Sequence, residues 1–149
     1  MKAMIALCLV LALLGCGDAT GPGPEPFAFK SGDTTIVIYI EPLAVSSDYA
    51  RWYATVEKCS GLQGDFAGVK WYVTPHPWPS ANGKMTSAVW TDRRIILNGE
   101  MLADSNLVKH ESLHDVLYVS GWRPPAKPAS EYTHADLHPA PPFGLCAPS

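Results

Sequence analysis

The sequence predicts an α+β domain with a small mixed or antiparallel sheet, two main helices and an irregular, proline-rich C-terminal tail. Two runs rich in β-branched and aromatic residues, at 34–40 and 69–75, have the composition of strands. Two stretches with helical spacing of apolar residues, at 46–60 and 105–120, are each followed by a glycine. The elements follow one another as strand, helix, strand, further strand or strands, helix and tail, which is the order of an α+β domain.

The first 32 residues are predicted to be export and linker sequence. Met1 and Lys2 give a positive start, and the apolar run after them is too short for a comfortable membrane-spanning helix. This layout is typical of a secretory signal over residues 1–15. Residues 16–32 are rich in glycine and proline and predict a flexible tether. The folded domain is therefore expected at 33–149.

The signal ends in "LLGC", with the cysteine at position 16, and this ending resembles the lipobox of bacterial lipoproteins. The resemblance implies that Cys16 becomes the lipidated first residue. It also implies a location at the bacterial cell envelope, facing the periplasm or the exterior, with the membrane as a partner through the lipid. The alternative is an ordinary signal peptide that is cleaved nearby.

The first strand and first helix follow the tether. The run "TTIVIYI" at 34–40 is continuously apolar, which suits a buried strand. Ser46 or Ser47 can cap the helix that follows, and Gly61 ends it. Aromatic and aliphatic residues at helical spacing predict the buried face of this helix. They are Tyr49, Trp52, Tyr53 and Val56.

The segment "AVWTDRRIILNGE", at 88–100, predicts either one long strand or a tight hairpin that turns at Asp92 and Arg93. Trp90 fits the core face of such a strand, and Arg93 fits a turn or the sheet surface. The second helix follows, and one of the polar residues at 104–106 is expected to cap it.

The cysteines indicate one disulfide. Cys8 leaves with the signal and Cys16 takes the lipid, so Cys59 and Cys146 remain. In an oxidising compartment these two can pair, which would tie the tail to the first helix and restrict the unfolded chain. The alternative is two free buried thiols.

The second helix contains the pattern H-E-x-x-H, formed by His110, Glu111 and His114. Residues four apart lie one turn apart on the same helical face, so both imidazoles can bind one ion. A glutamate next to the first histidine can act as the general base toward a water that the metal activates. The pattern therefore predicts a zinc site with Glu111 as the catalytic residue.

In this helix the sequence resembles the zincin metallopeptidases, most strongly over residues 105–118. The resemblance implies zinc as cofactor, a peptide or protein substrate, and a strand before the helix that pairs with the substrate. The run "RRIILN" at 93–98 occupies that place in the sequence. The chain departs from the zincins with a longer motif, because Leu117 and Ser120 stand where those have glycine and histidine.

A catalytic zinc needs a third protein ligand, and the tail supplies the candidates. His138 is favoured because it precedes Pro139 in a rigid segment whose end Cys146 can fix. His134 is the second choice, and Glu131 is the third. Asp115 can orient a ligand histidine from behind the site or be an ordinary solvated helix residue.

Three functions remain open. The first is a zinc-dependent hydrolase, specifically a peptidase, with Glu111 as general base. The second is a non-catalytic lipoprotein whose zinc is structural, with His134 and His138 both bound. The third is a lipoprotein that binds a partner and holds no metal. The formal net charge of −3 and the absence of a basic run argue against nucleic acid as a partner.

Overall fold

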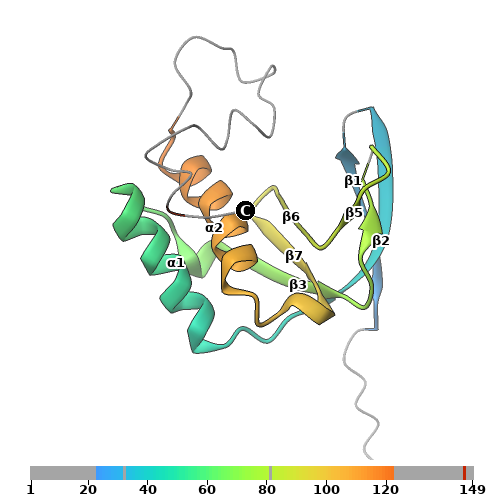
Figure 1. Ribbon diagram of the computed structural model, residues 1–149, viewed down its shortest axis with the longest axis horizontal. Helices are drawn as coiled ribbons and strands as arrows, with labels where there is room; N and C mark the ends of the chain where they lie inside the picture. The colour runs from blue at the N-terminus through green and yellow to red at the C-terminus, as the bar shows by residue number, and fades with distance from the viewer. Residues whose placement is uncertain (1–22, 32, 81, 123–145, 147–149) are drawn as a thin grey trace, which may run out of the picture.

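The protein is described here by a computed structural model, which covers residues 23–31, 33–80, 82–122 and 146. The fold is α+β, with a curled five-stranded mixed sheet and two helices, as the sequence predicts (Figure 1). The predicted signal peptide and most of the predicted proline-rich tail lie outside the described residues. The main elements are β1 Glu25–Ser31, β2 Thr34–Pro42, α1 Ser47–Ser60, β3 Lys70–Thr74, β6 Ala88–Thr91, β7 Arg94–Asn98 and α2 Ser105–Val119.

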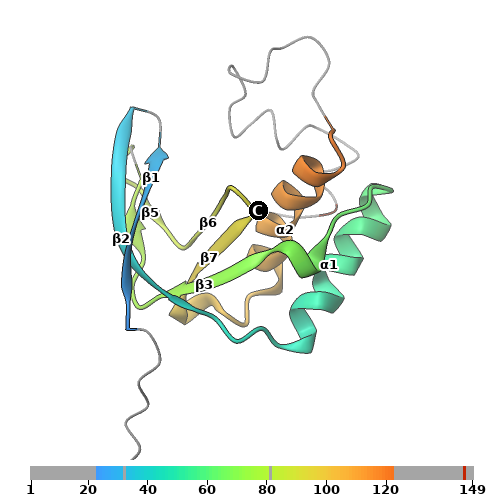
Figure 2. The ribbon, with the colours of Figure 1, turned by 180° about the vertical axis from the view of Figure 1, so that it is seen from behind.

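The strand order in the main sheet is β1-β2-β3-β7-β6. β3 and β7 run parallel, and the other neighbours are antiparallel. β2 pairs with β3 only through Glu41 and Pro42, whereas it pairs with β1 along seven residues. The β1–β2 hairpin therefore stands away from the two helices, as both views of the ribbon show (Figures 1 and 2). The short elements are η1 Phe66–Gly68, β4 Trp78–Pro79, β5 Met85–Thr86 and η2 Gly99–Met101.

The prediction of a tether over residues 16–32 is wrong for its last part. Residues 25–31 form β1, which pairs with β2 in a regular antiparallel register from Glu25–Ile40 to Ser31–Thr34. Pro26 is tolerated because β1 is an edge strand, where a missing N–H breaks no ladder between two neighbours. The folded domain thus begins about eight residues before the predicted boundary.

β2 is also less buried than predicted. Ile38 and Ile40 are buried, but Val37 and Tyr39 between them are 60% and 61% exposed. The strand is thus covered on one face only, because it belongs to a hairpin that the helices do not reach. Its apolar run comes from a preference for strand-forming residues on both faces.

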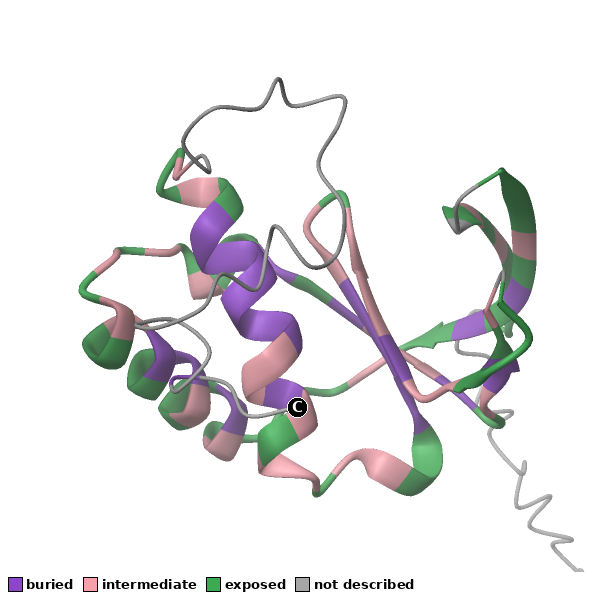
Figure 3. Ribbon diagram, turned by 45° about the horizontal axis from the view of Figure 1, so that its top comes forward, coloured by how far each residue is buried: buried purple, intermediate pink, exposed green. Residues whose placement is uncertain are grey.

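The two helices begin and end near the predicted residues. Ser46 is the N-cap of α1, although its hydroxyl makes no capping bond, and Gly61 ends the helix with a φ of 71°. Asp104 caps α2 by accepting hydrogen bonds from two backbone N–H groups. α2 is buried along most of its length, whereas α1 is exposed on its outer face (Figure 3).

Two apolar clusters lie on opposite faces of the central strands. Ile95 and Leu97 of β7 point to the helices and pack in a cluster with residues of α1 and α2. Ile96 points the other way, toward Ile38 and Trp78. We call these the helix-side cluster and the hairpin-side cluster.

The segment at 88–98 is a tight hairpin, one of the two predicted forms. β6 and β7 pair from Ala88–Leu97 to Thr91–Arg94. Asp92 and Arg93 form the turn with φ values of 47° and 60°, the left-handed region that such hairpin turns require.

The structure corrects the predicted substrate strand. β7 contains nearly all of "RRIILN" but pairs with β3 on one side and β6 on the other, so it has no free edge for a peptide. β6 is the edge strand on the helix side of the sheet.

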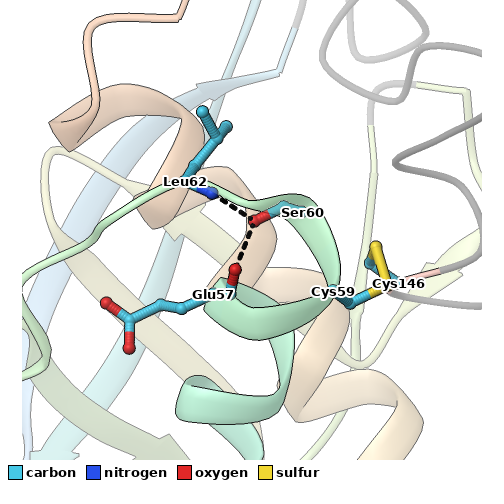
Figure 4. Close-up of a disulfide and its surroundings, with 5 residues drawn as sticks. All are labelled: Glu57, Cys59, Ser60, Leu62 and Cys146. Atoms are coloured by element: carbon cyan, nitrogen blue, oxygen red, sulfur yellow. Dashed lines mark hydrogen bonds between the residues drawn. A yellow bond between two sulfur atoms is a disulfide. The ribbon is translucent and has the colours of Figure 1, made fainter.

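A disulfide joins Cys59, in the last turn of α1, to Cys146, the pair that the sequence predicts (Figure 4). The two cysteines are 87 residues apart in the chain. Within the described ranges, no helix has the length and apolar character needed to cross a membrane.

Candidate metal centre on helix α2

The two histidines of H-E-x-x-H lie side by side on α2. The centroids of the His110 and His114 rings are 5.3 Å apart, and the ring planes meet at 74°. His114 is 5% exposed, and His110 is half-buried. The helical spacing thus brings two imidazoles together at the boundary between the core and the surface.

Glu111 lies in a different environment, although it is adjacent to His110 in sequence. It is 5% exposed, and its burial raises the pKa of the carboxyl to about 8. The backbone of Trp90, on the edge strand β6, partly opposes this rise. Glu111 is thus next to the sheet edge, and a cation held beside it would favour the ionised carboxylate.

Trp90 connects the edge strand to the histidine pair. Its ring stacks on that of His114, with centroids 6.2 Å apart and planes 23° from parallel. It also contacts Tyr118, one helical turn farther along α2, with centroids 5.3 Å apart. The sequence suggested that Trp90 is a core residue. In the structure its ring also lies against His114 of the candidate site.

Asp115 is completely buried, so it is not the solvated helix residue that the sequence allowed as one alternative. Its carboxylate accepts hydrogen bonds from three other side chains. Tyr53 donates its hydroxyl at 2.7 Å, Trp90 its indole N–H at 3.2 Å, and Arg93 its Nε at 3.2 Å and Nη2 at 3.3 Å. Asp115 thus ties α2 to α1 and to the β6–β7 hairpin.

Arg93 extends this network to the surface. Its Nη1 donates to Asp65 Oδ2 at 2.9 Å, and its Nη2 donates to the Asp65 carbonyl at 2.6 Å. The guanidinium lowers the pKa of the Asp65 carboxyl. Arg93 is thus a turn residue, as predicted, but its side chain also binds two carboxylates, one of them buried. No local sequence pattern indicates these contacts, because Asp65 and Asp115 lie 28 and 22 residues away.

The described residues supply two of the three protein ligands that a catalytic zinc needs. Two neighbouring imidazoles on one helical turn are suitable nitrogen ligands, with a carboxyl beside them. Among the described residues, no group of three or more histidine, cysteine, aspartate or glutamate side chains is arranged to hold a metal ion. The predicted third ligands His138, His134 and Glu131 lie outside those residues.

Comparison with protein-family models, with curated proteins and with solved structures found no match.

Proposed function

We propose that the protein is a zinc-dependent hydrolase of the peptidase type, with its site on α2. The observation that supports this most is the arrangement of H-E-x-x-H in the fold. His110 and His114 have adjacent rings, while the carboxyl of Glu111 is buried beside an edge strand. The resemblance to zincins is the reason for choosing peptides over other substrates.

In this proposal, His110 and His114 hold the zinc together with one residue of the tail. His138 is the proposed third ligand, and His134 is the alternative. Zinc, when bound, lowers the pKa of a water molecule toward 7 and polarises the carbonyl group of the scissile bond.

Glu111 is the proposed general base. It accepts a proton from the attacking water, whose oxygen forms a bond to the carbonyl carbon. When the carbon–nitrogen bond breaks, Glu111 returns this proton to the leaving nitrogen. The low exposure of its carboxyl limits competition from bulk water.

The edge strand β6 is the proposed binding strand for an extended peptide. Thr91 and Arg94 close a two-residue hairpin, and Ser87 accepts a hydrogen bond from the Asn98 N–H at 2.7 Å. By the alternation of antiparallel pairing, the backbone groups of Ala88 and Trp90 point away from β7. The Trp90 backbone is hydrogen-bonded to Glu111, so a peptide would pair through Ala88 and pass beside Glu111.

The test begins with metal content and peptide cleavage. Full-length protein purified without chelator should contain about one zinc per chain, and a mixture of unfolded peptides analysed by mass spectrometry should show new ends. Glu111→Gln should keep the zinc and lose at least about 100-fold in cleavage rate, because it removes the proton acceptor. His114→Ala should lose the bound zinc and the peptide cleavage.

Two results would contradict the proposal in different ways. Zinc without cleavage, unchanged by Glu111→Gln, would indicate a structural metal. Less than about 0.2 zinc per chain would indicate a protein that binds no metal in this site. Asp48→Asn, an exposed carboxylate on α1, is the control substitution.

We also propose that the lipid on Cys16 anchors the domain at the bacterial cell envelope. The support is the lipobox-like ending of the signal. Cys16→Ala should release the protein from the membrane fraction, and mass spectrometry of the native N-terminus should show the acyl chains. Unchanged membrane association with an unmodified cysteine would contradict the proposal.

A further inference from the structure

We propose that Trp90 is a positioning residue. Held by Asp115, it fixes the ring of His114 in the orientation in which that ring binds zinc. The inference rests on the proposed function, and it assigns a role to a residue outside the H-E-x-x-H pattern.

The first step is the attachment of the indole. Asp115 is fully buried, and its Oδ1 accepts the Trp90 indole N–H at 3.2 Å. The same carboxylate is held by Tyr53 at 2.7 Å and by two nitrogens of Arg93 at 3.2 and 3.3 Å. A carboxylate with four donors has little freedom to move, so it fixes one end of the indole.

The second step is the contact with the histidine. The Trp90 ring is 23° from parallel to the His114 ring, so it limits rotation of the imidazole on that side. His110 lies on another side, with its ring at 74° to that of His114. The His114 ring is thus confined by one aromatic neighbour from the sheet and one from its own helix.

The third step is the position of the strand that presents Trp90. β6 ends in the Asp92–Arg93 turn, and both of these residues have positive φ. Arg93 donates to Asp115 on α2 and to Asp65, so its side chain fixes this strained turn against the helix. The helix that carries the histidines therefore also sets the place of the tryptophan beside them.

The experiment compares Trp90→Phe with the wild type and with Trp52→Phe. Phenylalanine keeps an aromatic ring next to His114 but removes the donor to Asp115. Trp52 is a partly buried tryptophan on α1 that stacks on Tyr49, so its substitution controls for the loss of an indole elsewhere. The full chain is used throughout, with zinc as the metal.

The first measurement is zinc affinity by competition with a chromogenic chelator. Trp90→Phe should weaken zinc binding about tenfold or more, as substitutions behind metal ligands do. Its urea midpoint without metal gives the separate cost of removing one donor to the buried Asp115, and zinc affinity is compared under conditions in which both variants are folded. Equal loss of affinity in both variants, or none in Trp90→Phe, would overturn the inference.

The second measurement needs no metal, so it separates this inference from the proposed function. Three-bond couplings to the β-protons of His114 should indicate one χ1 rotamer in the wild type and in Trp52→Phe, but averaging in Trp90→Phe. Averaging in the wild type, or a single rotamer in Trp90→Phe, would overturn the inference. A wild type with an ordered His114 but no zinc would contradict the proposed function instead.

Asp115→Asn is the second variant, because it keeps the size of the side chain and one acceptor oxygen. Like Trp90→Phe, it should weaken zinc binding and should produce averaged couplings for the His114 side chain. A variant with unchanged affinity and one His114 rotamer would show that Asp115 does not act through Trp90.

Discussion

The helix side and the hairpin side of the sheet are built from similar residues but are covered very differently. On the helix side, α1 and α2 bury β-strand residues completely and enclose a polar network around Asp115. On the hairpin side, β1 and β2 bury Ile38 and Ile40 but leave Val37 and Tyr39 exposed. The buried hydrogen bonds of Asp115 thus lie next to the proposed site. The hairpin is stabilised by one apolar face and by its backbone pairing.

The largest effect on stability is expected at the centre of the helix side. Asp115→Ala removes a buried carboxylate and leaves donors of Tyr53, Trp90 and Arg93 without it, which should cost about 3–5 kcal/mol in the free energy of unfolding. Asp48→Ala, which removes an exposed ion pair with Arg51, should cost about 1 kcal/mol or less. Urea denaturation measures both, and similar costs would mean that the network does not stabilise the fold.

The hairpin offers the same comparison between two adjacent residues. Ile38 is 7% exposed and belongs to the hairpin-side cluster, so Ile38→Ala should cost about 2–4 kcal/mol. Val37 faces solvent, and Val37→Ala should change the free energy of unfolding by about 0.5 kcal/mol or less. Urea midpoints that fall equally would show that the outer face of β2 is covered in solution.

These expectations show what local sequence patterns can predict. The ends of the helices at Gly61 and Asp104, and the turn at Asp92 and Arg93, depend on nearest neighbours and were predicted. β1 was missed because a proline- and glycine-rich stretch becomes a strand only through its pairing with β2.

In the candidate site, too, contacts between residues close in sequence could be predicted and contacts between distant residues could not. The spacing of His110 and His114 is a local property of a helix, so their proximity could be predicted. Tyr53 reaches Asp115 from 62 residues away, and no periodicity indicates such a contact. The central place of β7 could have been inferred from Ile95, Ile96 and Leu97, because a run buried on both faces is typical of an inner strand.

Close packing around the network predicts a smaller effect at a glycine. A Cβ on Gly64 would press on the hydroxyl of Tyr53 and lie 2.7 Å from its ring carbon Cε1. Tyr53 is held by Asp115 and is 1% exposed, so it cannot move cheaply. Gly64→Ala should therefore cost about 1–3 kcal/mol.

The control is Gly23→Ala, just before the hairpin, where nothing lies within 4 Å of the added carbon. It should leave the melting temperature unchanged. Equal melting temperatures for the two variants would mean that Tyr53 can shift without loss.

The smallest effect is expected at the exposed end of the network. Arg93 lowers the pKa of Asp65, so this pair stabilises the fold above the ordinary pKa of 3.8 and loses that contribution as the pH falls below it. Asp65→Asn should lower the melting temperature slightly at pH 6, and the difference from the wild type should disappear near pH 2. A constant difference across this range would contradict the ionic origin.

The bond between Cys59 and Cys146 joins two positions that are 87 residues apart, so β3, β6, β7 and α2 all lie within one covalent loop of the chain. Such a loop restricts the unfolded chain. Reduction of this single bond should therefore lower the stability of all these elements together.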